Sequence, residues 1–150
     1  MAEGSEISGE EIAAAHAAIA ADVIHTPTLS LPAIDEMLGG RIALKAENLQ
    51  QTGSFKARGG SVKLASLGEE CARGVVAGTA GNHGRALAWA AKRRGIPCEL
   101  FVPEDAPISK TEPAARLGAA LTRCKGTVDE CVELATERAE ADGLTLVHPF

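Results

Sequence analysis

Apolar residues near the start of the chain recur at helical spacing. Ser8 and Glu11 have the S-x-x-E spacing of a capping box, which predicts the start of a helix. The apolar side chains that follow are three or four residues apart, at Ile12, Ala15, Ile19 and Val23. We expect this helix to stop at His25-Thr26-Pro27, because the residue before a proline disfavours helical backbone. A second, short helix is predicted over 31–38, ending at Gly39-Gly40.

From residue 41 onward, short apolar runs alternate with helical patterns. The pattern predicts strands at 41–46, 74–77, 97–102, 120–123 and 144–147, and helices that begin near 54 and 108 or cover 82–94 and 128–141. This alternation predicts an α/β fold with three layers, a parallel sheet with helices on both faces.

The same pattern divides the chain into two parts. Residues 41–150 form the predicted α/β domain, and residues 1–40 form an N-terminal helical segment outside the alternation. We expect the segment to pack on a part of the protein beyond these 150 residues. The last predicted strand is followed only by His148-Pro149-Phe150, so we also expect the chain to be incomplete at its C-terminus.

Composition narrows the class of protein. The chain has 150 residues, of which 45% are hydrophobic, enough for one domain with a real core. Aromatic residues are only 3%, so Ala, Leu, Val and Ile must build that core. The net charge of −5 argues against a nucleic-acid partner.

Compartment and metal content follow from simple patterns. No apolar run approaches the roughly 20 residues of a membrane helix, and the acidic N-terminus does not resemble a signal peptide. The four cysteines form no C-x-x-C pair, which argues against a zinc site or a disulfide framework. We therefore predict reduced thiols, no metal site, no membrane partner and a cytoplasmic location.

The segment around Lys56 is the first candidate for chemistry. Ser54 can cap a helix, which places Lys56 in the first turn, where the helix dipole disfavours a cation. A lysine that must lose its proton to form a Schiff base gains from that position, and Phe55 could add an apolar wall. A solvated lysine on an amphipathic helix is the alternative interpretation.

The second candidate is the glycine-rich segment 78–84, directly after a predicted strand. Small residues there allow close approach of a ligand, and free N–H groups at a helix start bind anions. The segment is neither a P-loop nor a G-x-G-x-x-G fingerprint. A tight turn with a capping Asn82 and a structural His83 is the alternative.

Together, the two segments carry a family resemblance. Ser54-Phe55-Lys56-Ala57-Arg58-Gly59 resembles the S-F-K-x-R-G signature of the fold type II (tryptophan-synthase-β-like) pyridoxal-phosphate enzymes, and Thr79 to Gly84 resembles their asparagine loop. The later run from Val102 to Pro107, with Lys110, fits the same pattern. Within that family, the chain resembles the threonine/serine dehydratases and serine racemases, from about Glu11 to Phe150.

The resemblance implies a cofactor and a set of roles. Lys56 would hold pyridoxal 5'-phosphate as a Schiff base and later remove the substrate α-proton. Phe55 would pack beside the cofactor ring, and Asn82 would hydrogen-bond its 3′-oxygen. The substrate carboxylate would be bound by Thr79, Ala80, Gly81, Asn82 and His83.

The resemblance also implies an activity, the conversion of L-threonine or L-serine to a 2-oxo acid and ammonia. Racemases of the family have a serine where Ala80 stands, so the sequence favours a lyase. A serine racemase or other β-replacing enzyme, and a non-catalytic α/β module, stay open as alternatives. The family's phosphate-binding loop would lie beyond residue 150, and the full-length form is expected to be a homo-oligomer.

Overall fold

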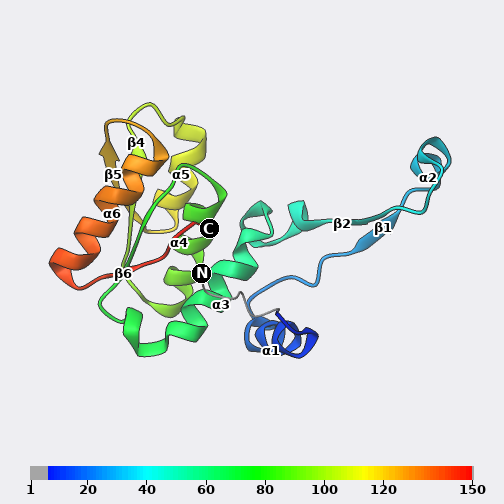
Figure 1. The fold of residues 1–150 in the computed structure, drawn as a ribbon, viewed down its shortest axis with the longest axis horizontal. Coiled ribbons are helices and arrows are strands. Elements are labelled where there is room, and N and C mark those ends of the chain that lie inside the picture. The colour runs from blue at the N-terminus through cyan, green and yellow to red at the C-terminus, as the bar shows by residue number, and fades with distance from the viewer. Residues whose placement is uncertain (1–6, 150) are drawn as a thin grey trace, which may run out of the picture.

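The computed structural model describes residues 7–149, so the first six residues of the predicted N-terminal segment and Phe150 lie outside the described residues. The order of helices and strands is shown in Figure 1. The helices are α1 (Gly9–Ile19), α2 (Pro32–Leu38), α3 (Lys56–Leu67), α4 (Asn82–Arg94), α5 (Ile108–Arg116) and α6 (Val128–Asp142). The strands are β1 (Thr28–Ser30), β2 (Ala43–Lys45), β3 (Val75–Gly78), β4 (Cys98–Pro103), β5 (Ala120–Cys124) and β6 (Thr145–Leu146), and three short 3₁₀ turns are η1 (Glu47–Leu49), η2 (Gln51–Gly53) and η3 (Gly68–Cys71).

A four-stranded parallel sheet forms the centre of the molecule, in the order β5-β4-β3-β6. Side chains alternate between its faces, as a pleated strand requires. Val75 and Leu100 face a core shared with α3, α4 and α5, whereas Val76 and Phe101 pack against the buried side of α6. The three-layer α/β prediction is therefore confirmed.

The strand order places a topological switch point between β3 and β6. The chain runs outward from β3 through β4 to β5, and then α6 returns it to the other side of β3. In open α/β sheets, ligands bind outside the carboxyl ends of strands at such a point. The segments that follow β3 and β6 are thus brought together.

The predicted strand at 41–46 is present, but it does not join the parallel sheet. β2 pairs antiparallel with β1, an element the sequence pattern did not predict, and all residues of both strands are exposed. Together with α2, these strands form an arm that projects away from the body (Figure 1). Arg41 and Lys45 flank its short apolar run, Ile42 to Leu44, which is too brief to mark a buried parallel strand on its own.

The first helix is shorter than its periodicity predicts. The Ser8–Glu11 capping box is present, but α1 ends at Ile19 and not near Val23. The chain then turns so that Asp22 can pair with Arg93 and Arg94 of α4. This pairing and the packing of α1 on α3 join the N-terminal segment to the body.

The prediction that all four cysteines are reduced is wrong for one pair. Cys124, at the end of β5, and Cys131, in the first turns of α6, form a disulfide. The parallel pairing of β5 beside β4 and the packing of α6 across the sheet bring these two buried side chains together. Cys71 and Cys98 are free and buried, and burial raises the pKa of the Cys98 thiol to about 12.

Among residues 7–149, no helix combines the length and apolar character needed to cross a membrane. In the same range, no cluster of three or more His, Cys, Asp or Glu side chains is arranged to hold a metal ion.

Candidate active site

Lys56 is the first residue of α3 and lies at the switch point of the sheet. Its Nζ donates a hydrogen bond to the backbone carbonyl of Pro149, with a distance of 3.1 Å between the two atoms. Pro149 follows β6, so the contact joins residues that are 93 positions apart. The lysine amine is therefore fixed at the carboxyl ends of the strands.

The helix that carries Lys56 does not begin as predicted. The N-cap position is occupied by Phe55 without a side-chain cap, and the Ser54 hydroxyl is buried with no hydrogen-bond partner among the described residues. Ser54 has extended backbone, and its carbonyl accepts from the Ala57 N–H at 3.4 Å. The predicted Ser54 cap is wrong, but the position of Lys56 in the first turn is correct.

Phe55 does not enclose the lysine amine. The side chain is 60% exposed, so its ring does not provide the apolar wall that the sequence suggested. The Lys56 Nζ lies 5.8 Å from the ring centroid, a distance at which an aromatic face attracts a cation.

A cavity of about 370 Å³ opens beside Lys56. Its wall combines the first turns of α3, His83 of α4 and the segment after β6, and the lining residues are Lys56, Gly59, Gly60, Lys63, His83, Leu146, Val147, His148 and Pro149. The volume lies in the range of small-molecule sites in proteins. Lys56 and His83, predicted from separate motifs, thus share one cavity.

His83 is held in this wall by the segment that follows β6. Its Nε2 lies 3.2 Å from the carbonyl oxygen of Val147. Burial lowers the pKa of His83, and the nearby charges of Lys56 and His148 add to this shift, whereas the Val147 hydrogen bond opposes it without reversing it. The imidazole is therefore favoured in its neutral form.

The loop after β3 forms two smaller hollows beside the main cavity. Thr79, Ala80 and Gly81 line a narrow crevice. A separate cavity of about 240 Å³ is lined by Gly81, Asn82, Arg85, Ser109 and Lys110. The Asn82 side chain is exposed and does not line the cavity of Lys56. Gly81, and not Asn82, is the N-cap residue of α4.

The sequence motifs did not identify the third wall of the main cavity. Leu146 to Pro149 supply it, and two of their carbonyl groups contact Lys56 and His83. The available signal was positional: these residues lie at the end of the predicted strand 144–147 and directly after it, a place that the 79–84 segment shares with respect to the strand 74–77.

An open parallel sheet with a lysine amine in a cavity at its switch point defines an α/β ligand-binding domain with a candidate nucleophile. The chain belongs to the family of pyridoxal-phosphate-dependent enzymes, whose family model matches residues 19–150. That family depends on the cofactor that the sequence motifs implied.

Individual relatives are similar over nearly the whole chain. A serine racemase of Dictyostelium discoideum is 40% identical over 142 residues, which cover 94% of this chain and 44% of the relative. An L-threonine ammonia-lyase of Thermotoga maritima is 44% identical over 131 residues, covering 86% of this chain and 33% of the relative.

Solved structures agree with the fold. The crystal structure of a T.th. threonine deaminase matches with a TM-score of 0.86 at 38% identity, over 96% of this chain and 46% of that one. The crystal structure of the Dictyostelium discoideum serine racemase matches with a TM-score of 0.85 at 42% identity, over 94% and 46%. The chain thus spans less than half the length of these relatives.

Proposed function

We propose that this chain is part of a pyridoxal-phosphate-dependent ammonia-lyase that converts L-threonine or L-serine to a 2-oxo acid and ammonia. The observation that carries the proposal is the Lys56 amine, which lies in a cavity at the switch point beside His83. Names of relatives support the class of reaction, since L-threonine ammonia-lyase and putative threonine dehydratase are among them.

The residues present fit the cofactor. Lys56 offers a primary amine to an aldehyde, in a cavity of small-molecule size that His83 also lines. When bound, pyridoxal phosphate supplies an electron sink for the electrons left on the substrate Cα. We propose that Lys56 and Phe55, with Asn82 from α4, hold it.

Substrate binding would use the start of α4. The first N–H groups of a helix have no partner within the helix and favour an anion, so the loop 79–81 with Asn82 and His83 is suited to a carboxylate. His83, kept neutral by burial, adds no positive charge to those of the lysines that line the cavity.

Lys56 would also move the proton. Its amine would take the Cα proton and then give a proton to the 3-hydroxyl, which would leave as water; hydrolysis of the resulting enamine would give the 2-oxo acid and ammonia. Alanine at position 80 cannot donate a proton to the substrate Cα from the face opposite Lys56, which favours elimination over racemisation. Serine racemase activity is the second candidate, because relatives with that name reach 40% identity.

Product analysis of the intact gene product separates these functions. With pyridoxal phosphate and L-serine or L-threonine, we expect 2-oxo acid release well above D-serine formation, and no release by a Lys56→Ala variant. D-serine as the main product would establish the racemase, and the absence of both products would leave a non-catalytic module.

We further propose that residues 1–40 pack on the part of the protein that corresponds to the remaining length of the relatives. The exposed arm supports this, because its residues Leu29, Met37 and Leu38 have apolar side chains in contact with solvent. A cytoplasmic location and a homo-oligomeric full-length form complete the proposal. Fractionation of cells that express the intact protein tests the location, and sedimentation of the purified protein tests the oligomeric state.

A further inference from the structure

The loop directly before Lys56 has a strained backbone. Thr52 has a φ of 64°, and it is the only non-glycine residue between 7 and 149 with a positive φ. Gly53 follows with a φ of 70°. The left-handed conformation is disfavoured for a non-glycine residue because the Cβ comes too close to the following carbonyl oxygen. The Thr52 hydroxyl is also buried without a hydrogen-bond partner in the described chain, so this loop needs contacts from elsewhere to keep its shape.

Gln50 provides such contacts at the N-terminal end of the loop. Its Nε2 donates to the Ile24 carbonyl at 2.8 Å, and its Oε1 accepts from the Ile24 N–H at 2.8 Å. The same Oε1 accepts from the Gln51 N–H at 2.9 Å. The Gln50 side chain is almost fully buried, so it pairs with Ile24 much as a strand would.

At the C-terminal end of the loop, Arg58 in the first turn of α3 pairs with Glu47 of η1. Arg58 donates from Nε and Nη2 to the two Glu47 oxygens, at 2.9 and 2.8 Å. These hydrogen bonds, together with one from the Thr26 hydroxyl, lower the pKa of Glu47 to about 2. Such a bidentate, charge-assisted pair fixes direction as well as distance.

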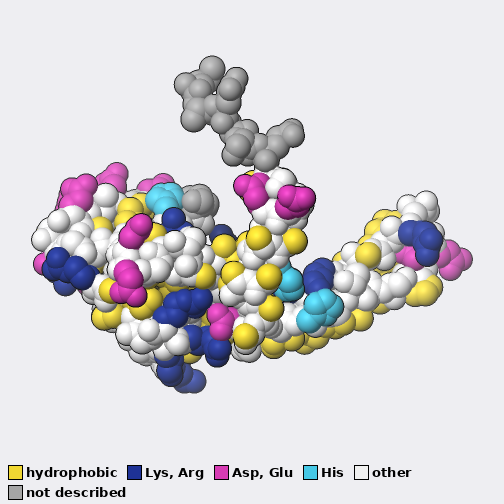
Figure 2. Space-filling model, turned by 90° about the horizontal axis from the view of Figure 1, so that it is seen from below, with side chains coloured by type: hydrophobic (Ala, Val, Ile, Leu, Met, Phe, Trp, Pro, Cys, Tyr) yellow, Lys and Arg dark blue, Asp and Glu magenta, His cyan; other side chains and the backbone are white. Residues whose placement is uncertain are grey.

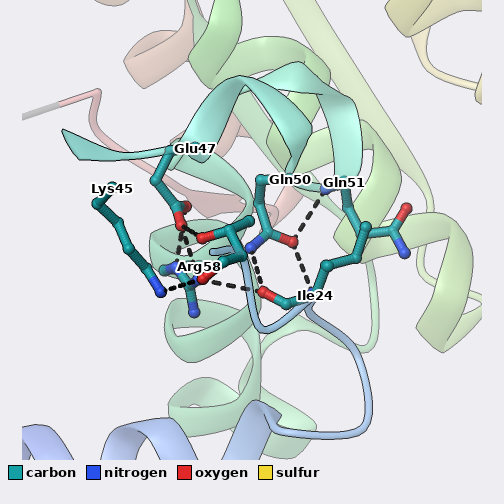
Figure 3. Close-up of polar contacts among 7 residues, drawn as sticks. Ile24, Lys45, Glu47, Gln50, Gln51 and Arg58 are labelled. Atoms are coloured by element: carbon teal, nitrogen blue, oxygen red, sulfur yellow. Dashed lines mark hydrogen bonds and ion pairs between the residues drawn. The ribbon is translucent and has the colours of Figure 1, made fainter. Parts of the chain in front are cut away.

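Both sides of the loop are therefore anchored to the same stretch, Ile24 to Thr26. Arg58 Nη2 also donates to the Ile24 carbonyl at 3.2 Å, and Lys45 donates to the Thr26 carbonyl at 2.6 Å. Figure 3 shows these residues converging from the N-terminal segment, the end of β2, the 3₁₀ turns and α3. We call this set the Glu47–Arg58 network; its members are Ile24, Thr26, Lys45, Glu47, Gln50, Gln51 and Arg58.

The network lies on the other side of the helix from the cavity. Residues two positions apart on a helix are separated by about 200°, so the side chains of Lys56 and Arg58 leave α3 in nearly opposite directions. Lys56 reaches the Pro149 carbonyl on one side, while Arg58 reaches Glu47 on the other.

We propose that Glu47 and Arg58 are positioning residues for Lys56. By fixing the strained loop and the first turn of α3, they hold the amine at the cavity in the orientation that an aldehyde requires. The inference rests on the proposed function, because it concerns the reaction of Lys56 with pyridoxal phosphate.

The test compares the rate of that reaction in two matched variants of the intact, cofactor-free protein. The Lys56 nitrogen bonds to the aldehyde carbon and the aldehyde oxygen leaves as water, which changes the cofactor absorbance. Arg58→Lys keeps the charge but loses the bidentate geometry. Arg138→Lys is the control, since Arg138 donates to Glu99 at 2.9 Å on the far side of the sheet, and the exposure of Glu99 (19%) matches that of Glu47 (18%).

We expect Arg58→Lys to slow the reaction at least about tenfold, since displacement of a reacting group by about 1 Å can cost 100-fold. Arg138→Lys should lower the Tm about as much as Arg58→Lys does, but its reaction rate should stay within about twofold of the wild-type rate. Glu47→Gln, which keeps the shape of the side chain, should behave as Arg58→Lys does and serves if that variant does not fold. Hydrogen exchange of the cofactor-free protein should be faster over residues 50–58 only in the network variants.

Equal rates in wild type and in both network variants would overturn the positioning role and leave the proposed function intact. Equal slowing by Arg58→Lys and Arg138→Lys would reduce the network to general stability, which also overturns the inference. A wild-type protein that does not react at Lys56 would instead contradict the proposed function itself.

Discussion

At the scale of single residues, the site depends on contacts that restrict an amine and an imidazole. Lys56 and His83 each contact a backbone carbonyl of the segment after β6. A carbonyl has no side chain to mutate and no charge, so it orients these groups without neutralising them. The Glu47 carboxylate, which could pair with a cation, is occupied by Arg58 instead.

His83 makes stability depend on pH. Its pKa is lowered by burial, so below its ordinary value of 6.5 the unfolded chain takes up a proton that the folded chain excludes. Stability should therefore fall as pH decreases from about 6.5. His83→Gln should flatten this slope in urea unfolding measured between pH 7.5 and 5.5, whereas substitution of the exposed His16 by Gln should not. An unchanged slope in His83→Gln would contradict a buried, neutral imidazole.

At the scale of elements, close approach of backbones sets the position of the loops around the site. Gly78 ends β3, and a Cβ added there would lie 2.3 Å from the backbone nitrogen of Val132 in α6. Because backbone atoms cannot rotate away, α6 can pack on this end of β3 only over a glycine. The loop 79–81 begins at the next residue.

Gly78→Ala should therefore be strongly destabilising. We expect a loss of about 3 kcal/mol in the free energy of unfolding, at the upper end of typical overpacking costs. Gly59→Ala is the control: no atom lies within 4 Å of an added Cβ, so helix propensity should make it neutral or stabilising by up to about 1 kcal/mol. Urea unfolding followed by circular dichroism measures both. A stable Gly78→Ala protein would contradict the packing of α6 on β3.

The Cys124–Cys131 disulfide joins the end of β5 to the start of α6. Because the bridge closes a short loop, its reduction should cost about 2 kcal/mol of stability. Peptide mass mapping without reductant should recover the 124–131 link, and unfolding should be sensitive to reductant. A Cys124→Ala/Cys131→Ala protein should not respond to reductant. Recovery of four free thiols from protein that has never been reduced would contradict the bridge.

The helices and strands also show which parts of the structure could be predicted from the sequence. The bounds of α4 match the expectation at both ends, and α6 differs by one residue, because local signals mark their ends: a left-handed glycine after each helix and a Thr127–Glu130 capping box. The β1–β2 pairing was missed because each strand has only three residues and pairs across a long connection. Lys56 and His83 were found through local motifs, whereas Glu47–Arg58 and the Val147 and Pro149 carbonyls contribute through contacts that no local pattern encodes.

At the scale of the whole molecule, the arm and the body differ in how they are stabilised. The body buries its apolar side chains on both faces of the sheet. The arm leaves Leu29 and Leu44 45% exposed, and Figure 2 shows hydrophobic side chains in a row along one of its edges. An isolated two-stranded sheet with apolar side chains in water is marginally stable, so the arm requires a partner surface.

Residues 1–150 expressed alone should therefore self-associate. Sedimentation should show concentration-dependent oligomers, and a Leu29→Lys/Leu44→Lys variant should shift them toward monomer by removing the apolar surface. Leu134→Lys, at an exposed position on α6, is the control and should not. A wild-type 1–150 protein that stays monomeric at high concentration would contradict this account of the arm.

The central claim is that the Lys56 amine reacts with pyridoxal phosphate in the cavity at the switch point. Its most direct test is reduction of the intact protein with borohydride after addition of the cofactor, followed by peptide mass spectrometry. The account predicts a pyridoxyl group on Lys56, absent from a Lys56→Ala protein. A label on Lys63 or Lys110 instead, or on no lysine, would contradict it.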